Sequence, residues 1–267
     1  MTWDDSTVCR MMMTIKSNQS VCETVICNWI PFVMKISIVS AILCVVVAAP
    51  SCAAADDWIE LFDGKTLNGW SPASHGRAEY SVQDGTIHGV TVEGSPNSFL
   101  TSDREFADFE LTFEVKVHDK LNSGVQIRSR EKTEADVAAE VERTGKQPRG
   151  TNGVGRFHGP QVEIESSPGQ AAYIYGEATG LGWLSPEPKD QNHAHSHMKN
   201  GEWNTIRIWA KGPRIQTWIN GEKVADLTHE GIYKTHPKGK IGLQVHGIRA
   251  GTGPFDVAWR NIRIREL

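Results

Sequence analysis

The chain has 267 residues, a formal net charge of −4 at pH 7 and 39% hydrophobic residues. This mild acidity does not indicate nucleic acid or an anionic membrane surface as a partner. The length is sufficient for one domain with a sizeable core. A small-molecule ligand therefore remains the partner class to consider, and nothing in the sequence indicates an oligomeric state.

Residues 34–55 have the three parts of a secretory signal peptide. Met34-Lys35 is a basic start, Ile36–Ala49 is an apolar run of 14 residues, and small residues follow up to Ala55. As a helix this run would extend about 21 Å, whereas a hydrocarbon core is about 30 Å thick. We therefore predict cleavage near Ala55 and a periplasmic or extracellular protein, with no membrane insertion of the mature chain. A lipoprotein anchor at Cys52 is the alternative, which the neighbouring proline disfavours.

Residues 1–33 have no pattern of their own, and we expect that Met34 is the true start and that this extension is a mis-called segment. All five cysteines precede the predicted cut. The mature chain, 56–267, therefore has no disulfide and depends on its core for stability. It shows no repeat and no linker, which predicts a single domain.

Short segments rich in β-branched and aromatic residues follow one another along the mature chain, separated by turn residues. Asp84-Gly85 and Asn220-Gly221 are typical of two-residue type I′ hairpin turns. Many short strands with such turns predict an all-β sandwich or jelly roll. We expect strands at 58–62, 80–83, 86–90, 98–101, 109–117, 125–130, 161–165, 172–176, 181–184, 205–210, 214–219, 222–224, 239–246 and 257–264.

Two segments interrupt this β pattern and are predicted to be surface loops. The first, 131–156, contains a possible short helix, Thr133–Arg143, with Thr133 as its N-cap and Asp136 at the capping-box position. The second, 186–201, contains three histidines. Long loops of this kind often form the rim or lid of a site.

The segment from Gln161 to Glu165 alternates strictly between polar and apolar residues, which predicts a strand with one face in the core. The outward face carries an amide and two carboxylates, Gln161, Glu163 and Glu165, at intervals of about 6.5–7 Å. Such a face is a poor structural surface, and we consider it the candidate site.

Other strands carry large planar polar or aromatic side chains opposite their aliphatic face. Amide and guanidinium groups can bridge sugar hydroxyls while indole rings pack on sugar C–H faces. If these strands share one sheet, the side chains converge on a carbohydrate. Besides the candidate strand, this group comprises Gln126 and Arg128, Tyr175, Arg207 and Trp209, Gln216 and Trp218, and Gln244 and His246.

Several sequence pieces, in the same order along the chain, resemble the bacterial 3-keto-disaccharide hydrolase domain family. They are LFDGKTLNGW (61–70), VQDGTI (82–87), DFEL (108–111), NSGV (122–125) with Arg128, IYG (174–176), GEWN (201–204), NG (220–221), GLQ (242–244) and RNIRI (260–264). The resemblance implies a concanavalin A-like jelly roll over 58–267, export, and cleavage of glycosidic bonds in 3-keto sugars. The chain departs from the family pattern in one stretch, because Gln161, Glu163 and Ser166 stand where the family commonly has Glu, Gln and Asp.

A ketone at C3 of a sugar acidifies the C2 hydrogen, so that a base can remove it and expel the C1 substituent before water is added. This route needs a base, an acid for the leaving oxygen and an electrophile for the enolate. Glu163 is the first candidate base, with Glu165 and His246 as alternatives, and Arg128 is the candidate electrophile. Direct hydrolysis would instead use Glu163 and Glu165 as a carboxylate pair.

Two further alternatives remain open. His193, His195 and His197 alternate in a loop and could bind a divalent metal as a cofactor, or they could be an exposed run without such a role. The domain could also be a non-catalytic carbohydrate-binding module that uses Trp209, Trp218 and the amides alone. A perturbed carboxylate in a cleft would favour the enzyme.

Overall fold

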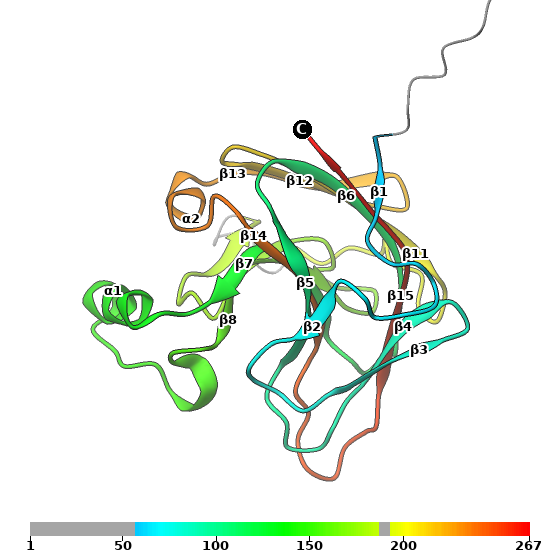
Figure 1. The fold of residues 1–267 in the computed structure, drawn as a ribbon, viewed down its shortest axis with the longest axis horizontal. Helices are drawn as coiled ribbons and strands as arrows, with labels where there is room; N and C mark the ends of the chain where they lie inside the picture. The colour runs from blue at the N-terminus through cyan, green and yellow to red at the C-terminus, as the bar shows by residue number, and fades with distance from the viewer. Residues whose placement is uncertain (1–56, 187–192) are drawn as a thin grey trace, which may run out of the picture. The chain divides into compact units, whose positions relative to one another are not determined.

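The computed structural model describes residues 57–186 and 193–267, which form two antiparallel sheets packed face to face (Figure 1). The eight-stranded sheet has the order β13 (Glu222–Thr228), β12 (Arg214–Ile219), β11 (Asn204–Lys211), β6 (Phe109–Val117), β15 (Asp256–Glu266), β4 (Thr86–Val90) and β3 (Glu79–Gln83), and β1 (Ile59–Glu60) pairs with β15. The seven-stranded sheet has the order β10 (Gly182–Ser185), β9 (Ile174–Glu177), β8 (Phe157–Ile164), β7 (Ser123–Glu131), β14 (Gly239–Val245), β5 (Ser98–Phe106) and β2 (Trp70–Pro72). The predicted all-β, concanavalin A-like jelly-roll sandwich is confirmed. The predicted extension and signal peptide, 1–55, lie outside the described residues.

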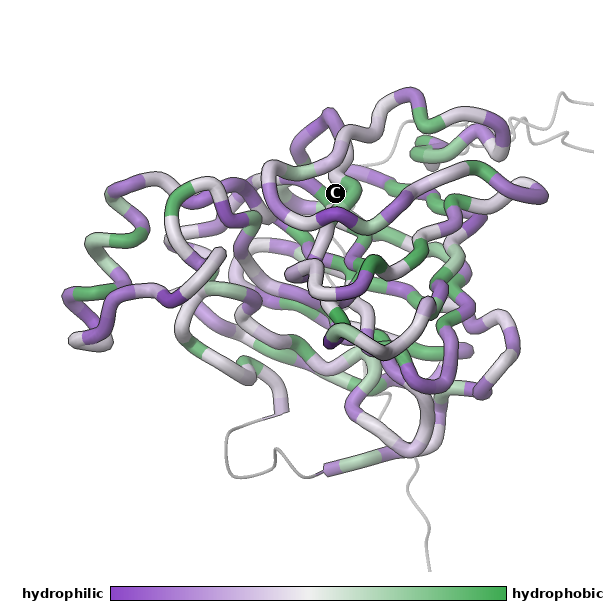
Figure 2. Tube along the Cα trace, turned by 90° about the horizontal axis from the view of Figure 1, so that it is seen from below, coloured by the Kyte–Doolittle hydropathy of each residue, from purple (hydrophilic) through white to green (hydrophobic). Residues whose placement is uncertain are grey.

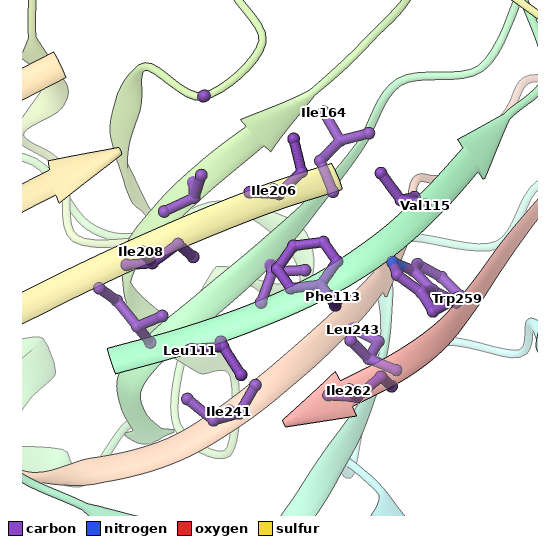
Figure 3. Packing of buried hydrophobic residues seen from close by; sticks show 14 of the residues in the cluster. Leu111, Phe113, Val115, Ile164, Ile206, Ile208, Ile241, Leu243, Trp259 and Ile262 are labelled. Carbon is purple, nitrogen blue, oxygen red and sulfur yellow. The ribbon is translucent and has the colours of Figure 1, made fainter. Parts of the chain in front are cut away.

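The core lies between the two sheets and follows from the alternation of each strand. Along β6, Leu111, Phe113 and Val115 are fully buried, and they face Ile241 and Leu243 of the other sheet (Figure 3). Burying each such side chain contributes about 1.5–3 kcal/mol relative to leaving it exposed. Hydrophobic and hydrophilic residues accordingly alternate along the strands in Figure 2.

Both predicted type I′ turns are present, because Asp84 and Asn220 adopt positive φ values of 48° and 52° and each is followed by a glycine with positive φ. The predicted helix is also confirmed. It runs as α1 from Glu134 to Thr144 with the Thr133–Asp136 capping box, and the short 3₁₀ helix η1 (Gly150–Asn152) follows.

A second helix, α2 (Glu230–Thr235), was not expected from the sequence. It joins β13 to β14, and the His229 side chain accepts the Ile232 amide at its N-terminus. Neither helix within the described ranges has the length and apolar character that crossing a bilayer would require.

A bulge in β7 changes the expected orientation of Arg128. Gln126 pairs with Gln161 and Arg130 pairs with His158, so β7 has one more residue than β8 between these pairs. Arg128 lies in this bulge with a φ of 51°, and its side chain is 2% exposed. Instead of sharing the outward face of Gln126, its guanidinium reaches the turns at the end of the eight-stranded sheet. The expectation that Arg128 faces a ligand is therefore wrong.

The guanidinium of Arg128 ties the two sheets together. It donates hydrogen bonds to the Ala107 carbonyl at 2.5 Å, the Gly212 carbonyl at 2.7 Å and the Asp108 carboxylate at 2.9 Å. Burial lowers the pKa of Arg128, and Asp108 partly restores it. A buried charge with three satisfied contacts has a structural role in this position.

We expect Arg128→Met to lower the free energy of unfolding by about 3–5 kcal/mol, because it removes a buried hydrogen-bonded charge. Chemical denaturation measures this change. Arg104→Met is the matched control, since Arg104 is exposed and pairs with Glu266 at the surface, and we expect it to change stability by about 1 kcal/mol or less. Equal stabilities of the two variants would contradict the structural role.

Candidate functional site

The outer face of the seven-stranded sheet, turned away from the core, carries a row of polar side chains. On β8, Val162 and Ile164 are in the core, so Gln161 and Glu163 point to the opposite face. Gly124 of β7 pairs with Glu163 on one side and with Gln244 of β14 on the other. The register therefore places an acid and an amide on either side of a glycine.

Gly124 provides the space in which the side chain of Gln161 lies. A Cβ atom at Gly124 would be 2.5 Å from the Gln161 amide carbon and 2.7 Å from its amide nitrogen. Any side chain there would displace the amide from the sheet surface. The glycine thus allows Gln161 to reach across β7 toward Gln244.

Two amide side chains hold the carboxylate of Glu163, and a third orients one of them. Gln244 Nε2 donates to Gln161 Oε1 at 2.9 Å, and Gln161 Nε2 donates to Glu163 Oε2 at 3.1 Å. Asn122 Nδ2 donates to Glu163 Oε1. Each carboxylate oxygen therefore has one donor, and the carboxyl group is fixed in orientation.

Burial raises the pKa of Glu163 to about 7 from an ordinary value of 4.5. The negative charges of Glu165 and Glu177 raise it further, while the hydrogen bonds from Asn122 and Gln161 oppose the shift. Glu163 is 6% exposed. A carboxyl group with this pKa exchanges its proton near neutral pH, which is suitable for a general base or acid.

A pocket of about 250 Å³ opens over this carboxyl group. Tyr175 of β9 and Trp183 of β10 form one side, with their rings edge to face at 5.3 Å between centroids. His246 follows β14, and its Nδ1 lies 2.7 Å from the Gly247 carbonyl. This contact requires a proton on Nδ1, so in the neutral ring Nε2 is an acceptor. The full lining is Asn122, Gln161, Glu163, Tyr175, Glu177, Trp183, Gln244 and His246.

The structure brings together five of the predicted site residues, namely Gln161, Glu163, Tyr175, Gln244 and His246. Gln126 is adjacent to Gln161 in the sheet, but it is fully buried and does not line the pocket. Its amide nitrogen instead contacts the Phe157 carbonyl at 3.5 Å.

Glu165 lies beyond the end of β8 and outside the pocket. Its Oε1 accepts the backbone amide of Gln170, so it belongs to the turn that follows the strand. The expected pair of Glu163 and Glu165 acting on one bond is therefore wrong. The carboxylate that shares the pocket with Glu163 is Glu177.

Trp209 and Trp218 belong to β11 and β12 of the eight-stranded sheet, and neither lines the pocket. The Arg207 guanidinium covers the Trp218 ring at 4.1 Å from its centroid. Alternation correctly predicted that these side chains point outward, but they do so on the opposite side of the sandwich. The expectation that they grip the same ligand as Glu163 is wrong.

The predicted histidine metal site is not supported. His195 Nε2 lies 2.9 Å from the Ala171 carbonyl, and its Nδ1 accepts the His197 amide at 3.3 Å. His193 instead contacts the Tyr173 ring, edge to face at 6.4 Å between centroids. In the two described ranges, no group of three His, Cys, Asp or Glu side chains is arranged to hold a metal ion.

Sequence reasoning missed three lining residues, Asn122, Glu177 and Trp183. Glu177 is two residues after Tyr175 on β9 and therefore shares its face, which the alternation could have indicated. Trp183 pairs with Tyr175 across the β9–β10 connection. Asn122 precedes β7, and only the folded structure places its side chain against Glu163.

The fold and the pocket define a jelly-roll protein with a protonatable acid beside aromatic and amide side chains. The chain belongs to the family of 3-keto-alpha-glucoside-1,2-lyase-like domains, whose model matches residues 57–265. It is 34% identical over 245 residues to a 3-keto-disaccharide hydrolase of Bacteroides thetaiotaomicron, an alignment that covers 80% of this chain and 79% of the relative.

Two solved structures from Bacillus subtilis are also similar to this chain. The carbohydrate-binding module CBM66 is 11% identical with a TM-score of 0.49, over 74% of this chain and 95% of that one. A protein of unknown function with a galectin-like fold is 13% identical with a TM-score of 0.48, over 75% of this chain and 90% of that one.

We expect Gly124→Ala to push the Gln161 amide away from Glu163, lower stability by about 1–3 kcal/mol and raise the pKa of Glu163 above its present value. The pKa rises because the displaced amide no longer stabilises the ionised form. Carbon NMR of labelled glutamate side chains measures the titration. Gly153→Ala is the control, because a Cβ there meets open space. An unchanged Glu163 titration in Gly124→Ala would contradict the predicted displacement.

Proposed function

We propose that this protein cleaves glycosidic bonds of 3-keto-glycosides or 3-keto-disaccharides, with Glu163 as the base. Membership of the family and the 34% identity to a 3-keto-disaccharide hydrolase support the substrate class. The observation that carries the catalytic role is the burial of Glu163 in the pocket, which raises its pKa to about 7. A structural surface carboxylate would have neither property.

The reaction begins with removal of the proton at C2, next to the C3 ketone. Glu163 takes this proton, and the electron pair of the C–H bond becomes an enolate that extends to the ketone oxygen. The enolate then expels the C1 oxygen, which accepts a proton as it leaves, and water adds to the resulting double bond. A base with a pKa near the working pH is efficient in such a step.

Other lining residues have chemistry that suits the remaining roles. Burial raises the pKa of Tyr175, so its hydroxyl stays protonated and can donate to a developing negative charge. The His246 ring offers a second polar contact at the pocket edge. Trp183 lies beside Tyr175 and provides an aromatic surface for sugar C–H groups.

The position of Glu165 favours elimination over direct hydrolysis by two adjacent carboxylates. Its side chain is engaged by the Gln170 amide outside the pocket, so it is not available as a second acid or nucleophile. The proposed route requires one ionised carboxylate as base, a role for which Glu163 is suited, and donors for the leaving oxygen and for the enolate, of which Tyr175 can supply one.

We also propose that the protein is exported. The support is the sequence of 34–55 with its basic start, apolar run and small residues. A periplasmic or extracellular location would give the pocket access to sugars from outside the cell. N-terminal sequencing of the protein from its host tests this, and a start well before Ala55 would contradict cleavage there.

We expect Glu163→Gln to reduce turnover of a 3-keto-disaccharide by about 10²–10⁴-fold while sugar binding persists. The amide keeps the shape of the carboxyl group but cannot accept the C2 proton. Product analysis after incubation with oxidised and unoxidised disaccharides measures turnover. Glu165→Gln is the matched control and should retain activity. Wild-type turnover by Glu163→Gln would refute the assignment, and binding without product in the native protein would favour a carbohydrate-binding module.

We expect kcat/KM to rise with pH and to reach half its plateau near pH 7. The base must be ionised to remove the C2 proton, and burial holds the pKa of Glu163 at about 7. Initial rates between pH 5 and 9 would measure this profile. A rate that is already maximal at pH 5 would contradict a buried carboxylate base.

A further inference from the structure

Glu177 is the second carboxylate in the pocket, and a buried arginine holds it in place. Arg156 Nη2 and Asn97 Nδ2 both donate to Glu177 Oε1, the latter at 3.2 Å. Asn97 also accepts the Gly247 amide at 2.9 Å through its Oδ1. The Glu177 carboxylate is thus fixed by three separate parts of the chain: Asn97 before β5, Arg156 before β8, and Gly247, which holds Asn97.

The guanidinium that pairs with Glu177 is not accessible to a ligand. The Arg156 side chain is 3% exposed, Nη1 donates to the Asn97 carbonyl at 3.0 Å, and the guanidinium lies over the Phe99 ring at 5.2 Å. Both hydrogen bonds to Glu177 go to Oε1, so among the described residues Oε2 is the oxygen left for a ligand. A bound sugar therefore meets the carboxylate and not its counter-charge.

The pocket thus presents acids and amides without an accessible cation. Among the described residues that line it, none is Lys or Arg. A carboxylate acceptor binds neutral hydroxyl groups well, whereas a ligand carboxylate beside Glu163 and Glu177 would be repelled in a partly desolvated site. The lining of the pocket would therefore favour uncharged ligands over negatively charged ones.

We propose that Glu177, held by Arg156 and Asn97, is a specificity residue that accepts hydrogen bonds from sugar hydroxyls and restricts the pocket to uncharged sugars, excluding hexuronates. This inference rests on the proposed function, because it concerns which 3-keto sugar the pocket accepts. In this proposal Glu177 selects the substrate and transfers no proton.

The test compares methyl 3-keto-glucoside with the corresponding methyl 3-keto-glucuronide at pH 8.5. We expect the native protein to prefer the neutral sugar by about tenfold or more in kcat/KM, and Glu177→Gln to reduce this preference by about tenfold. Most of the change should appear in KM, because the residue binds the sugar without reacting.

Glu165→Gln is the matched control. Glu165 and Glu177 both raise the pKa of Glu163 through their charge, but Glu165 lies outside the pocket. Both variants should shift the pH profile of kcat/KM to lower pH, and only Glu177→Gln should change the preference for uncharged sugar. If both variants changed the preference for uncharged sugar equally, the effect would come from the overall negative charge near the pocket and not from Glu177 itself. That result would overturn the proposal.

Glu177→Gln leaves Arg156 buried without a counter-charge, and such a variant can fail to fold. The double variant Glu177→Gln/Arg156→Met removes both charges, and it should show the same loss of preference. Turnover of both sugars at similar rates by the native protein would overturn this inference alone. Turnover of neither sugar would overturn the proposed function, and this inference with it.

Discussion

The carboxyl group of Glu163 is the constraint on which the site depends. Its pKa of about 7 against 4.5 for an exposed group corresponds to roughly 3 kcal/mol. The folded state holds this proton more tightly than the unfolded state. Protonated Glu163 therefore contributes its full stabilisation of the fold below the unfolded pKa of 4.5, and this contribution is lost as the pH rises through 7. Above that pH the fold carries a buried, partly compensated anion.

The rest of the architecture offsets this loss and keeps the carboxyl group oriented. Fully buried side chains such as Phe113 and Trp259 supply the hydrophobic stabilisation, and Arg128 fixes the ends of the two sheets. At the site itself, Asn122 and Gln161 supply donors without supplying charge. Neutral donors hold the anion while leaving its pKa near neutrality, whereas a cation in the same place would lower it strongly.

Strand alternation could predict much of the fold and part of the site. It placed Gln161, Glu163 and Gln244 on outward faces, and these side chains do meet. It could not predict Arg128, because one additional residue in β7 reverses the side chains that follow. Local backbone geometry of this kind leaves no clear mark in the sequence.

The failure with Trp209 and Trp218 has a different cause. Alternation gives the face of a strand, but it does not give the sheet to which the strand belongs. Both tryptophans do point outward, from the sheet opposite the pocket. Sheet membership depends on long-range pairing, such as β11 with β6, which residue patterns within one strand do not specify.

Two glutamates only two residues apart show how sharply the end of a strand can separate two roles. Glu163 lies within β8, where neighbouring strands on both sides exclude water from its carboxyl group. Glu165 follows Ile164, the last residue of the strand, and its carboxylate satisfies the backbone amide of Gln170 in the next turn. The difference in burial, and not in residue type, makes one acid a candidate base and the other a turn residue. A strand longer by two residues would have placed both acids on the same sheet surface, and the repulsion that Glu165 already exerts on Glu163 would have been stronger.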